Sequence, residues 1–186
     1  MPRLSSLDDI NRLYAERGGL NYGEGVTQTE HALQCAALAE EQGASPSLVV
    51  AALLHDIGHL FADEADVAEA RLDDRHEAAG ARALEGLFDE AVRAPIALHV
   101  QAKRWLCFRE PGYHGALSPA SQRSLELQGG PLDQAGAEAF EKSPYWREAV
   151  TLRRFDDTGK RQGLSYRAFA DYTPLMHSLR INTAAS

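Results

Sequence analysis

The chain has 186 residues, of which 44% are hydrophobic, so it can form one globular domain with a sizeable core. Its net charge of −8 argues against nucleic acid or an anionic membrane surface as the main partner, since both favour a basic face. The longest apolar run, Leu48–Leu54, is too short to cross a bilayer, and the N-terminus lacks the apolar core of a signal peptide. The two cysteines match no disulfide framework, which is typical of a cytoplasmic protein.

Helix signals recur along the chain and strand signals are rare, so the sequence predicts an all-α fold. Thr27 and Glu30 form a capping box that opens a helix bearing His31. The next helix begins with an N-cap serine and a proline at 45–46, and we expect it to continue through the apolar stretch into LLHDIGHL at 53–60.

Four further helices are expected downstream. They are a helix bearing His76, a helix after Pro95 that bears His99, a helix opened by Ser118 and Pro119, and a helix opened by Ser143 and Pro144 that runs to residue 157. A last helix begins near Tyr166, and Pro174 is expected to kink or end it. The stretches 18–25 and 111–131 predict loops that border a site.

Six side chains of metal-binding type fall on these predicted helices: His31, His55, Asp56, His76, His99 and Asp156. Any one of these histidines alone would more often be a core residue bonded to a carbonyl, but the whole series favours metal binding. Four ligands can hold one metal ion, whereas six, with Asp56 bridging, can hold two ions roughly 3.5 to 4 Å apart. The sequence therefore predicts a dinuclear metal centre.

Donor side chains lie one helical turn from several of these ligands: they are His59, Lys103 and Arg153. Guanidinium and ammonium groups suit an anion with several oxygens, such as a phosphate or phosphonate. Ser121 and Gln122, in the helix after the proline at 119, are the candidates for further hydroxyl and amide donors. The alternative is that the cations make only surface salt bridges, worth roughly 0 to 1 kcal/mol each.

Six segments combine these residues into a recognisable pattern. They are YGEGVTQTEHALQCA, VVAALLHDIGHL, DDRHEAAGARAL, HVQAKRWL, LSPASQRSLELQGG and LRRFDDTGK. Together they resemble the HD-domain mixed-valent diiron oxygenases, especially the PhnZ-like organophosphonate oxygenases, and more distantly myo-inositol oxygenase. The resemblance implies a single HD domain over 1–186, with a core at about 22–172, built as a helical bundle around the dinuclear site.

The resemblance also implies cofactors and residue roles. It implies two iron ions, one ferrous and one ferric, bridged by Asp56, with dioxygen as co-substrate. It assigns the six metal ligands named above, and it reads Asp157 as a residue that merely flanks Asp156. The phosphonate-binding set that it implies is His59, Lys103, Ser121 and Arg153.

The implied reaction is cleavage of the carbon–phosphorus bond of a small 1-hydroxy-2-aminoethylphosphonate, or of its trimethylammonio form, giving phosphate and glycine or glycine betaine. Two alternatives remain. One is hydroxylation at C1 of an aminoethylphosphonate on the same diiron site. The other is hydrolysis of a phosphoester by a metal-bound water, the commonest activity of HD proteins. His76 and His99, together with Lys103 and Arg153, favour the oxygenase.

Tyr22 and Glu24 are candidates for a lid or for contact with the amine end of the substrate. In PhnZ-like relatives the equivalent tyrosine and glutamate are separated by two residues, whereas here one residue separates them, and an ordinary exposed turn is the alternative. Carboxylate charge and aromatic faces can hold a trimethylammonium group. Because Tyr113 could join Tyr22 in an aromatic wall, we expect the trimethylated substrate.

Overall fold

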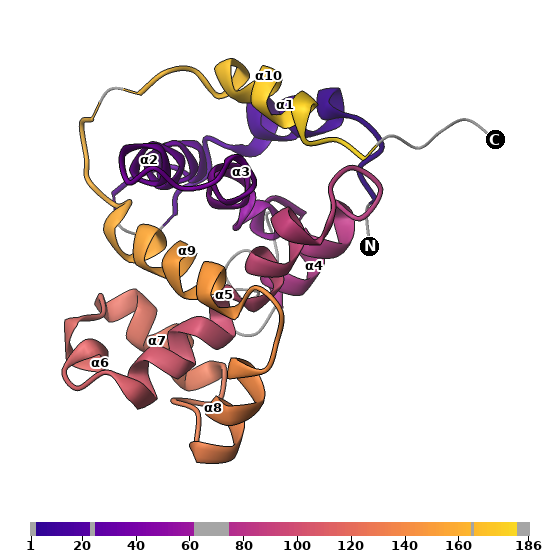
Figure 1. Ribbon diagram of the computed structural model, residues 1–186. Helices are drawn as coiled ribbons and strands as arrows, with labels where there is room; N and C mark the ends of the chain where they lie inside the picture. Colours follow the sequence, from indigo (N-terminus) through magenta and orange to yellow (C-terminus); the bar gives the residue numbers. More distant parts are fainter. Residues whose placement is uncertain (1–2, 23–24, 62–74, 165, 182–186) are drawn as a thin grey trace.

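The computed structural model describes residues 3–22, 25–61, 75–164 and 166–181, and these residues are helical without a β-strand (Figure 1). Their helices are α1 (Leu7–Arg17), α2 (Gln28–Glu41), α3 (Pro46–Leu54), η1 (Ile57–Phe61), α4 (His76–Ala83), α5 (Glu90–Arg109), α6 (Tyr113–Ala116), α7 (Pro119–Leu127), α8 (Gln134–Glu141), α9 (Trp146–Thr158), η3 (Phe169–Tyr172) and α10 (Thr173–Ser178). The predicted all-α class is confirmed.

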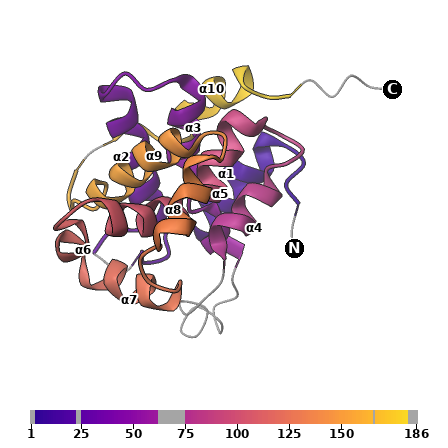
Figure 2. The ribbon, with the colours of Figure 1, turned by 60° about the horizontal axis from the view of Figure 1, so that its bottom comes forward.

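Helices α2, α3, α5 and α9 form the centre of the bundle. α5 packs along α9 and against α3 and α4, while α2 packs against α3 and α9. α1 and α10 lie side by side at one end of the molecule, and α6, α7 and α8 gather at the other (Figure 1). In the rotated view of Figure 2, α10 lies at the top and α6 and α7 lie at the lower left. The helices expected to carry the site residues are thus the ones that pack together.

Two apolar clusters stabilise this arrangement. The larger one joins α1, α2, α3, α4 and the first half of α5, with side chains such as Ile10, Leu53 and Ile96 completely buried. The smaller one, around Ala102 and Phe140, joins α8 to α5 and α9. Each fully buried large apolar side chain contributes about 1.5 to 3 kcal/mol. Because α5 contributes to both clusters, packing fixes it on two sides.

The sequence predicted that the His-Asp (HD) dipeptide lies within a helix. In the structure it lies directly after one. α3 ends at Leu54, and η1 follows the dipeptide. Side chains satisfy carbonyl groups in the last turn of α3, which stabilises a helix end at this position. The Tyr14 hydroxyl donates to the carbonyl of Leu53 (3.1 Å), and His55 Nδ1 donates to the carbonyl of Ala52 (2.9 Å).

Three other helix boundaries differ from the expected ones. α5 begins before Pro95 because the Asp89 side chain accepts a hydrogen bond from the backbone of Ala91 and caps the helix. α9 begins at Trp146 rather than at the preceding serine–proline pair, after a residue in the left-handed conformation. Pro174 opens α10 rather than ending a helix, since a proline fits the first turn, where no N–H donor is needed.

None of the helices in the described ranges has the length and apolarity needed to cross a membrane.

Candidate metal centre

The six predicted metal-type side chains converge in the middle of the bundle. They are His31 on α2, His55 and Asp56 after α3, His76 at the start of α4, His99 on α5 and Asp156 on α9. Each is buried, with between 0% and 8% of its surface exposed. The structure therefore brings together six polar groups from five separate segments of the chain.

The imidazole nitrogens face one another in two pairs. The Nε2 atoms of His31 and His55 are 3.2 Å apart, and so are those of His76 and His99. Asp56 lies between the pairs. Its Oδ2 is 3.6 and 3.3 Å from the first pair, and its Oδ1 is 3.4 and 3.6 Å from the second. One carboxylate oxygen thus faces each pair, which is the arrangement of a bridging ligand.

Backbone carbonyls fix the orientation of three imidazoles. The bonds run from His31 Nδ1 to the carbonyl of Gly159 (2.8 Å), from His55 Nδ1 to that of Ala52 (2.9 Å), and from His99 Nδ1 to that of Ile96 (2.8 Å). A carbonyl only accepts, so Nδ1 carries a proton, and in the neutral form of each ring the Nε2 lone pair faces the centre. Two lone pairs 3.2 Å apart repel, and a cation between them removes the repulsion. The donor set therefore fits a metal ion.

The charges of this cluster are strongly coupled. Burial favours a neutral Asp56, but His55, His59 and His76 together hold the pKa of its carboxyl well below the usual range. Burial likewise disfavours a charged His55, yet the carboxylate of Asp56 raises the pKa of that ring to about 9, so a metal ion that binds there displaces the second proton of the ring. For His99, burial and the charge of His76 lower the pKa. The carboxylate thus keeps its negative charge in a buried place, which favours cations.

Asp156 and Cys35 both lie next to the His31–His55 pair. Oδ1 of Asp156 is 3.4 Å from His31 Nε2, and Cys35 Sγ is 3.7 Å from the same atom. Burial and the two nearby carboxylates raise the pKa of the Cys35 thiol well above its usual value, so the thiol is protonated and a weak ligand. Burial also opposes ionisation of Asp156, but Arg153 and Lys160 hold its pKa well below the usual range. The charged carboxylate is the better ligand.

Three cationic side chains, Lys103, Arg153 and Lys160, gather around Asp156. Lys103 and Arg153 are only 3% and 4% exposed, so neither makes a surface salt bridge. Arg153 Nη1 is 2.5 Å from Asp156 Oδ2, and its other Nη donates to Asp157. Burial opposes the charge of Arg153, but the two carboxylates raise its pKa. Arg153 thus carries its charge inside the protein.

A hydrogen-bond network connects the two lysines through α7. Lys103 Nζ donates to Ser124 Oγ (2.8 Å), and Ser124 Oγ donates to the carbonyl of Ser121 (3.1 Å). Lys160 Nζ is 3.4 Å from Ser121 Oγ and 3.8 Å from Asp156 Oδ1. Burial and the charge of Arg153 lower the pKa of Lys103 to about 7. We call this cluster of side chains, formed by Lys103, Ser121, Ser124, Arg153 and Lys160, the cationic pocket, a name that refers to their charge and burial and not to an open cavity.

Sequence analysis missed three of the residues in this region. Lys160 follows Asp156 by four positions and Ser124 follows Ser121 by three, so helical spacing could have indicated both. Asp157, read as a flanking residue, pairs with Arg153 and accepts a bond from the Tyr113 hydroxyl.

The structure does not bring Gln122 into the cationic pocket. Its side-chain amide donates to the backbone carbonyls of Leu117 (3.1 Å) and His114 (3.4 Å), in the connection between α6 and α7. The amide therefore holds this connection.

His59 and Tyr22 stack on imidazoles at two edges of the metal cluster. The His59 ring lies 3.9 Å from that of His76, and its side chain is 31% exposed. The Tyr22 ring lies 3.9 Å from that of His31, and its hydroxyl donates to Asp156 Oδ1 (3.2 Å). Tyr22 thus reaches the cluster despite its unusual spacing. Glu24 lies outside the residues that the structure describes.

Comparison with known proteins agrees with this geometry. Residues 29–129 match the family model of the HD domain. Over 91% of its length the chain is 47% identical to a Gimesia maris protein named hydroxymethylphosphonate dioxygenase, of which 84% is covered. Over 91% of its length it is 38% identical to a Leisingera caerulea protein named [1-hydroxy-2-(trimethylamino)ethyl]phosphonate dioxygenase (glycine-betaine-forming), of which 88% is covered. Over 93% of its length it is 34% identical to an uncharacterized protein of Acanthamoeba polyphaga mimivirus, of which 81% is covered.

The bundle and its central His-Asp dipeptide are those of an HD-domain protein. Within that class the chain belongs to the PhnZ-like HD-domain oxygenases, as the sequence predicted. It is therefore an enzyme of the dioxygenase type, which uses a metal and dioxygen.

Proposed function

We propose that the protein catalyses the iron- and dioxygen-dependent cleavage of the carbon–phosphorus bond of a 1-hydroxyalkylphosphonate, releasing phosphate and a carboxylate. The observation that carries this proposal is the combination of two facing pairs of imidazole nitrogens around one carboxylate with a buried cationic pocket beside them. The first feature suits a pair of metal ions. The second suits an anion with three oxygens.

In this proposal His31, His55 and Asp156 would hold one iron ion, His76 and His99 would hold the other, and Asp56 would offer one carboxylate oxygen to each. The distances within each group, 3.2 to 3.6 Å, support this division. Imidazole and carboxylate also suit manganese, nickel and zinc, but zinc has no redox chemistry. The choice of iron, and of the mixed-valent state, rests on the kinship with the diiron oxygenases. When bound, the irons would supply the redox chemistry that activates dioxygen for attack at C1.

The cationic pocket supplies the binding energy for the phosphonate. Lys103, Arg153 and Lys160 bring positive charge to one side of the metal cluster, inside a chain whose net charge is −8. Charge-assisted hydrogen bonds to an oxyanion are roughly twice as strong as neutral ones. The hydroxyl of Ser121 adds a neutral donor, and His59 offers a ring nitrogen at the exposed edge of the His76–His99 pair. These groups would orient C1 toward the metal centre.

We further propose hydroxymethylphosphonate as the preferred substrate, rather than the trimethylated one expected from the sequence. The Tyr22 ring already packs against His31, which favours a substrate without a bulky group on C1. The hydroxyl of Tyr113 is engaged with Asp157 and Arg153, so it gives little support to an aromatic wall around an ammonium group. The relative with 47% identity carries the name of the smaller substrate.

Phosphate release with and without dioxygen tests the proposal. Hydroxymethylphosphonate, its amino- and trimethylammonio-containing analogues, and a nucleotide are compared side by side. Hydroxymethylphosphonate should consume one dioxygen and give phosphate and formate in equal amounts. Phosphate release without dioxygen, or from the nucleotide alone, would assign the protein to the phosphohydrolases. Oxidation at C1 without phosphate release would make it a hydroxylase, and a higher kcat/KM for the trimethylated analogue would restore the earlier substrate.

A further inference from the structure

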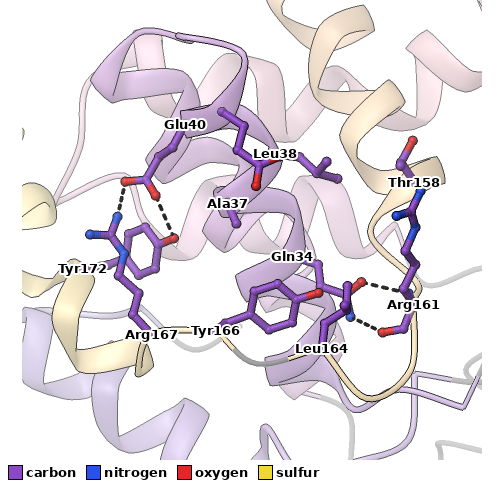
Figure 3. A pocket seen from close by; sticks show the side chains of 11 residues that line it. Gln34, Ala37, Leu38, Glu40, Thr158, Arg161, Leu164, Tyr166, Arg167 and Tyr172 are labelled. Carbon is purple, nitrogen blue, oxygen red and sulfur yellow. Dashed lines mark hydrogen bonds and ion pairs between the residues drawn. The ribbon is translucent and has the colours of Figure 1, made fainter.

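The side-chain amide of Gln34, on α2, makes two hydrogen bonds to the backbone of a single residue in the loop after α9. Its Nε2 donates to the backbone carbonyl of Arg161 (2.9 Å), and its Oε1 accepts from the backbone N–H of the same residue (2.8 Å), as Figure 3 shows. Gln34 is 3% exposed. Among the side chains, only the amides of Asn and Gln combine an acceptor with an N–H donor in this planar geometry. The pair of bonds therefore acts as a clamp, and it depends on this residue type.

The clamped loop carries two groups that face the candidate site. The carbonyl of Gly159 accepts from His31 Nδ1 (2.8 Å), and the ammonium of Lys160 reaches the cationic pocket. The N–H of Gly159 in turn donates to the carbonyl of Phe155 at the end of α9 (2.8 Å). The orienting carbonyl is thus held between α9 on one side and the Gln34 clamp on the other.

On its outer side this loop has little packing to hold it in place. Residues 161 to 164 are all exposed, and the clamp forms part of the wall of a surface cavity of about 530 Å³ (Figure 3). On the inner side the loop lies close to α2: a Cβ added at Gly159 would be 2.7 Å from Cys35 Sγ and 3.3 Å from the backbone nitrogen of Cys35. A small displacement of the loop would therefore move the carbonyl that orients His31.

We propose that Gln34 is a positioning residue of the metal centre, which sets the metal affinity of the His31–His55 half by fixing the Gly159 carbonyl. This inference rests on the metal-binding role proposed above for His31. Hydrogen-bond partners that orient a metal-binding imidazole typically change metal affinity by 10- to 100-fold, roughly, when they are lost. Gln34 acts one step further out, through the loop that presents such a partner.

The test is a titration of metal-free protein with Co²⁺, followed by its visible absorption. Gln34→Met keeps the length of the side chain but removes both hydrogen bonds. We expect the wild-type protein to bind two ions, and Gln34→Met to bind one of them roughly tenfold or more weakly while the other is unaffected. Equal affinities for variant and wild type, or equal weakening of both steps, would overturn the proposal.

A second variant moves the same carbonyl from the opposite side. Gly159→Ala places a methyl group against Cys35, so it should weaken the same binding step even if Gln34→Met fails to fold. Arg161→Ala is the matched control, because it keeps both backbone atoms that the clamp uses, and it should bind Co²⁺ as the wild type does. If Arg161→Ala weakens binding as much as Gln34→Met, loss of the cavity wall, and not of the clamp, is the cause, and the proposal is wrong.

The titration is independent of the proposed reaction. A wild-type protein that binds two Co²⁺ ions but, when loaded with iron, releases no phosphate from any of the 1-hydroxyalkylphosphonates would refute the proposed function and leave the clamp testable. A wild-type protein that binds a single ion would refute the dinuclear assignment, and the ratio of variant to wild-type affinity for that ion would still decide whether Gln34 matters.

Discussion

The metal cluster and the cationic pocket adjoin each other but are held in different ways. In the metal cluster, three imidazoles donate to backbone carbonyls: those of Ala52 and Ile96 lie in helices, and that of Gly159 lies directly after α9 in the loop that Gln34 holds. In the cationic pocket, side chains hold side chains: Arg153 pairs with two carboxylates, and Lys103 donates to Ser124. Side-chain partners can exchange when a phosphonate arrives, whereas backbone carbonyls in or next to helices keep their positions. The geometry of the metal cluster is therefore preorganised by the backbone, whereas the geometry of the cationic pocket depends on attraction between its charged side chains.

If this difference holds, changes in the cluster should act on metal content, and changes in the pocket on the binding of substrate. Asp56→Ala should have the largest effect, because its two oxygens face both imidazole pairs. We expect loss of most of the metal and a fall in activity of roughly a thousandfold or more, since the metal ions contribute several kcal/mol. Elemental analysis and phosphate release measure this. Asp8→Ala, at an exposed position in α1, is the control, and an Asp56→Ala protein that keeps two metal ions would contradict the bridging role.

Arg153 belongs to both regions, so it tests how separable they are. Arg153→Ala removes the cation that bonds to both Asp156 and Asp157 and leaves only the more distant Lys160 near Asp156, which costs about 3 to 5 kcal/mol. This corresponds to a thermal midpoint lower by roughly 6 to 20 °C for a chain of this size. Thermal unfolding of the metal-free protein measures it, and Arg153→Lys should recover part of the loss. An unchanged midpoint with a raised KM would place Arg153 in the pocket alone.

Lys103→Met should affect substrate binding alone. A charge-assisted hydrogen bond contributes about 1.5 to 3 kcal/mol, so KM for the phosphonate should rise roughly 10- to 150-fold. Metal content should stay at the wild-type level, because Lys103 bonds to Ser124 and is not part of the metal cluster. Kinetics and elemental analysis on one preparation decide the matter. Loss of metal in this variant would show that the two regions are not separable.

The pKa of Lys103, lowered to about 7, predicts a pH dependence. The ammonium loses its proton as the pH rises through about 7, so KM should rise above that pH, by at most about tenfold per pH unit. Lys103→Met should abolish this rise. The free energy of unfolding should increase over the same pH range. Between pH 7 and 10.5 the unfolded chain keeps a proton on Lys103 that the folded chain has lost. The destabilising effect of the buried ammonium therefore decreases as the pH increases. A KM that is flat from pH 6 to 9 would contradict the prediction.

The smallest effect is expected within α7, where two polar residues face different partners. Ser124→Ala removes a hydroxyl that positions Lys103 but keeps the ammonium itself, and the net contribution of a typical hydrogen bond, about 0.5 to 1.5 kcal/mol, predicts a rise in KM of roughly 2- to 13-fold. Gln122→Ala should change KM less, since its amide bonds to backbone carbonyls near α6. The reverse order of the two effects would return Gln122 to the substrate-binding set.

The sequence predicted the fold class, and it singled out six metal-type residues that the structure brings together, because local helix signals lie beside most of them. The capping box before His31 and the ligand-and-cation spacing of His99 and Lys103 are such signals. The end of α3 could not be predicted, because it depends on the hydroxyl of Tyr14, a residue 39 positions away from its partner. The loop after α9 was missed for the same reason: its position depends on Gln34, whose contact with Arg161 spans 127 positions.

The end of α3 at Leu54 also has an electrostatic consequence. The peptide dipoles of a helix add up to about half a negative elementary charge at its C-terminal end. The HD dipeptide follows that end directly, so the aligned peptide groups of α3 attract a cation before any side chain is counted. This attraction belongs to the backbone, and no substitution at His55 or Asp56 can remove it.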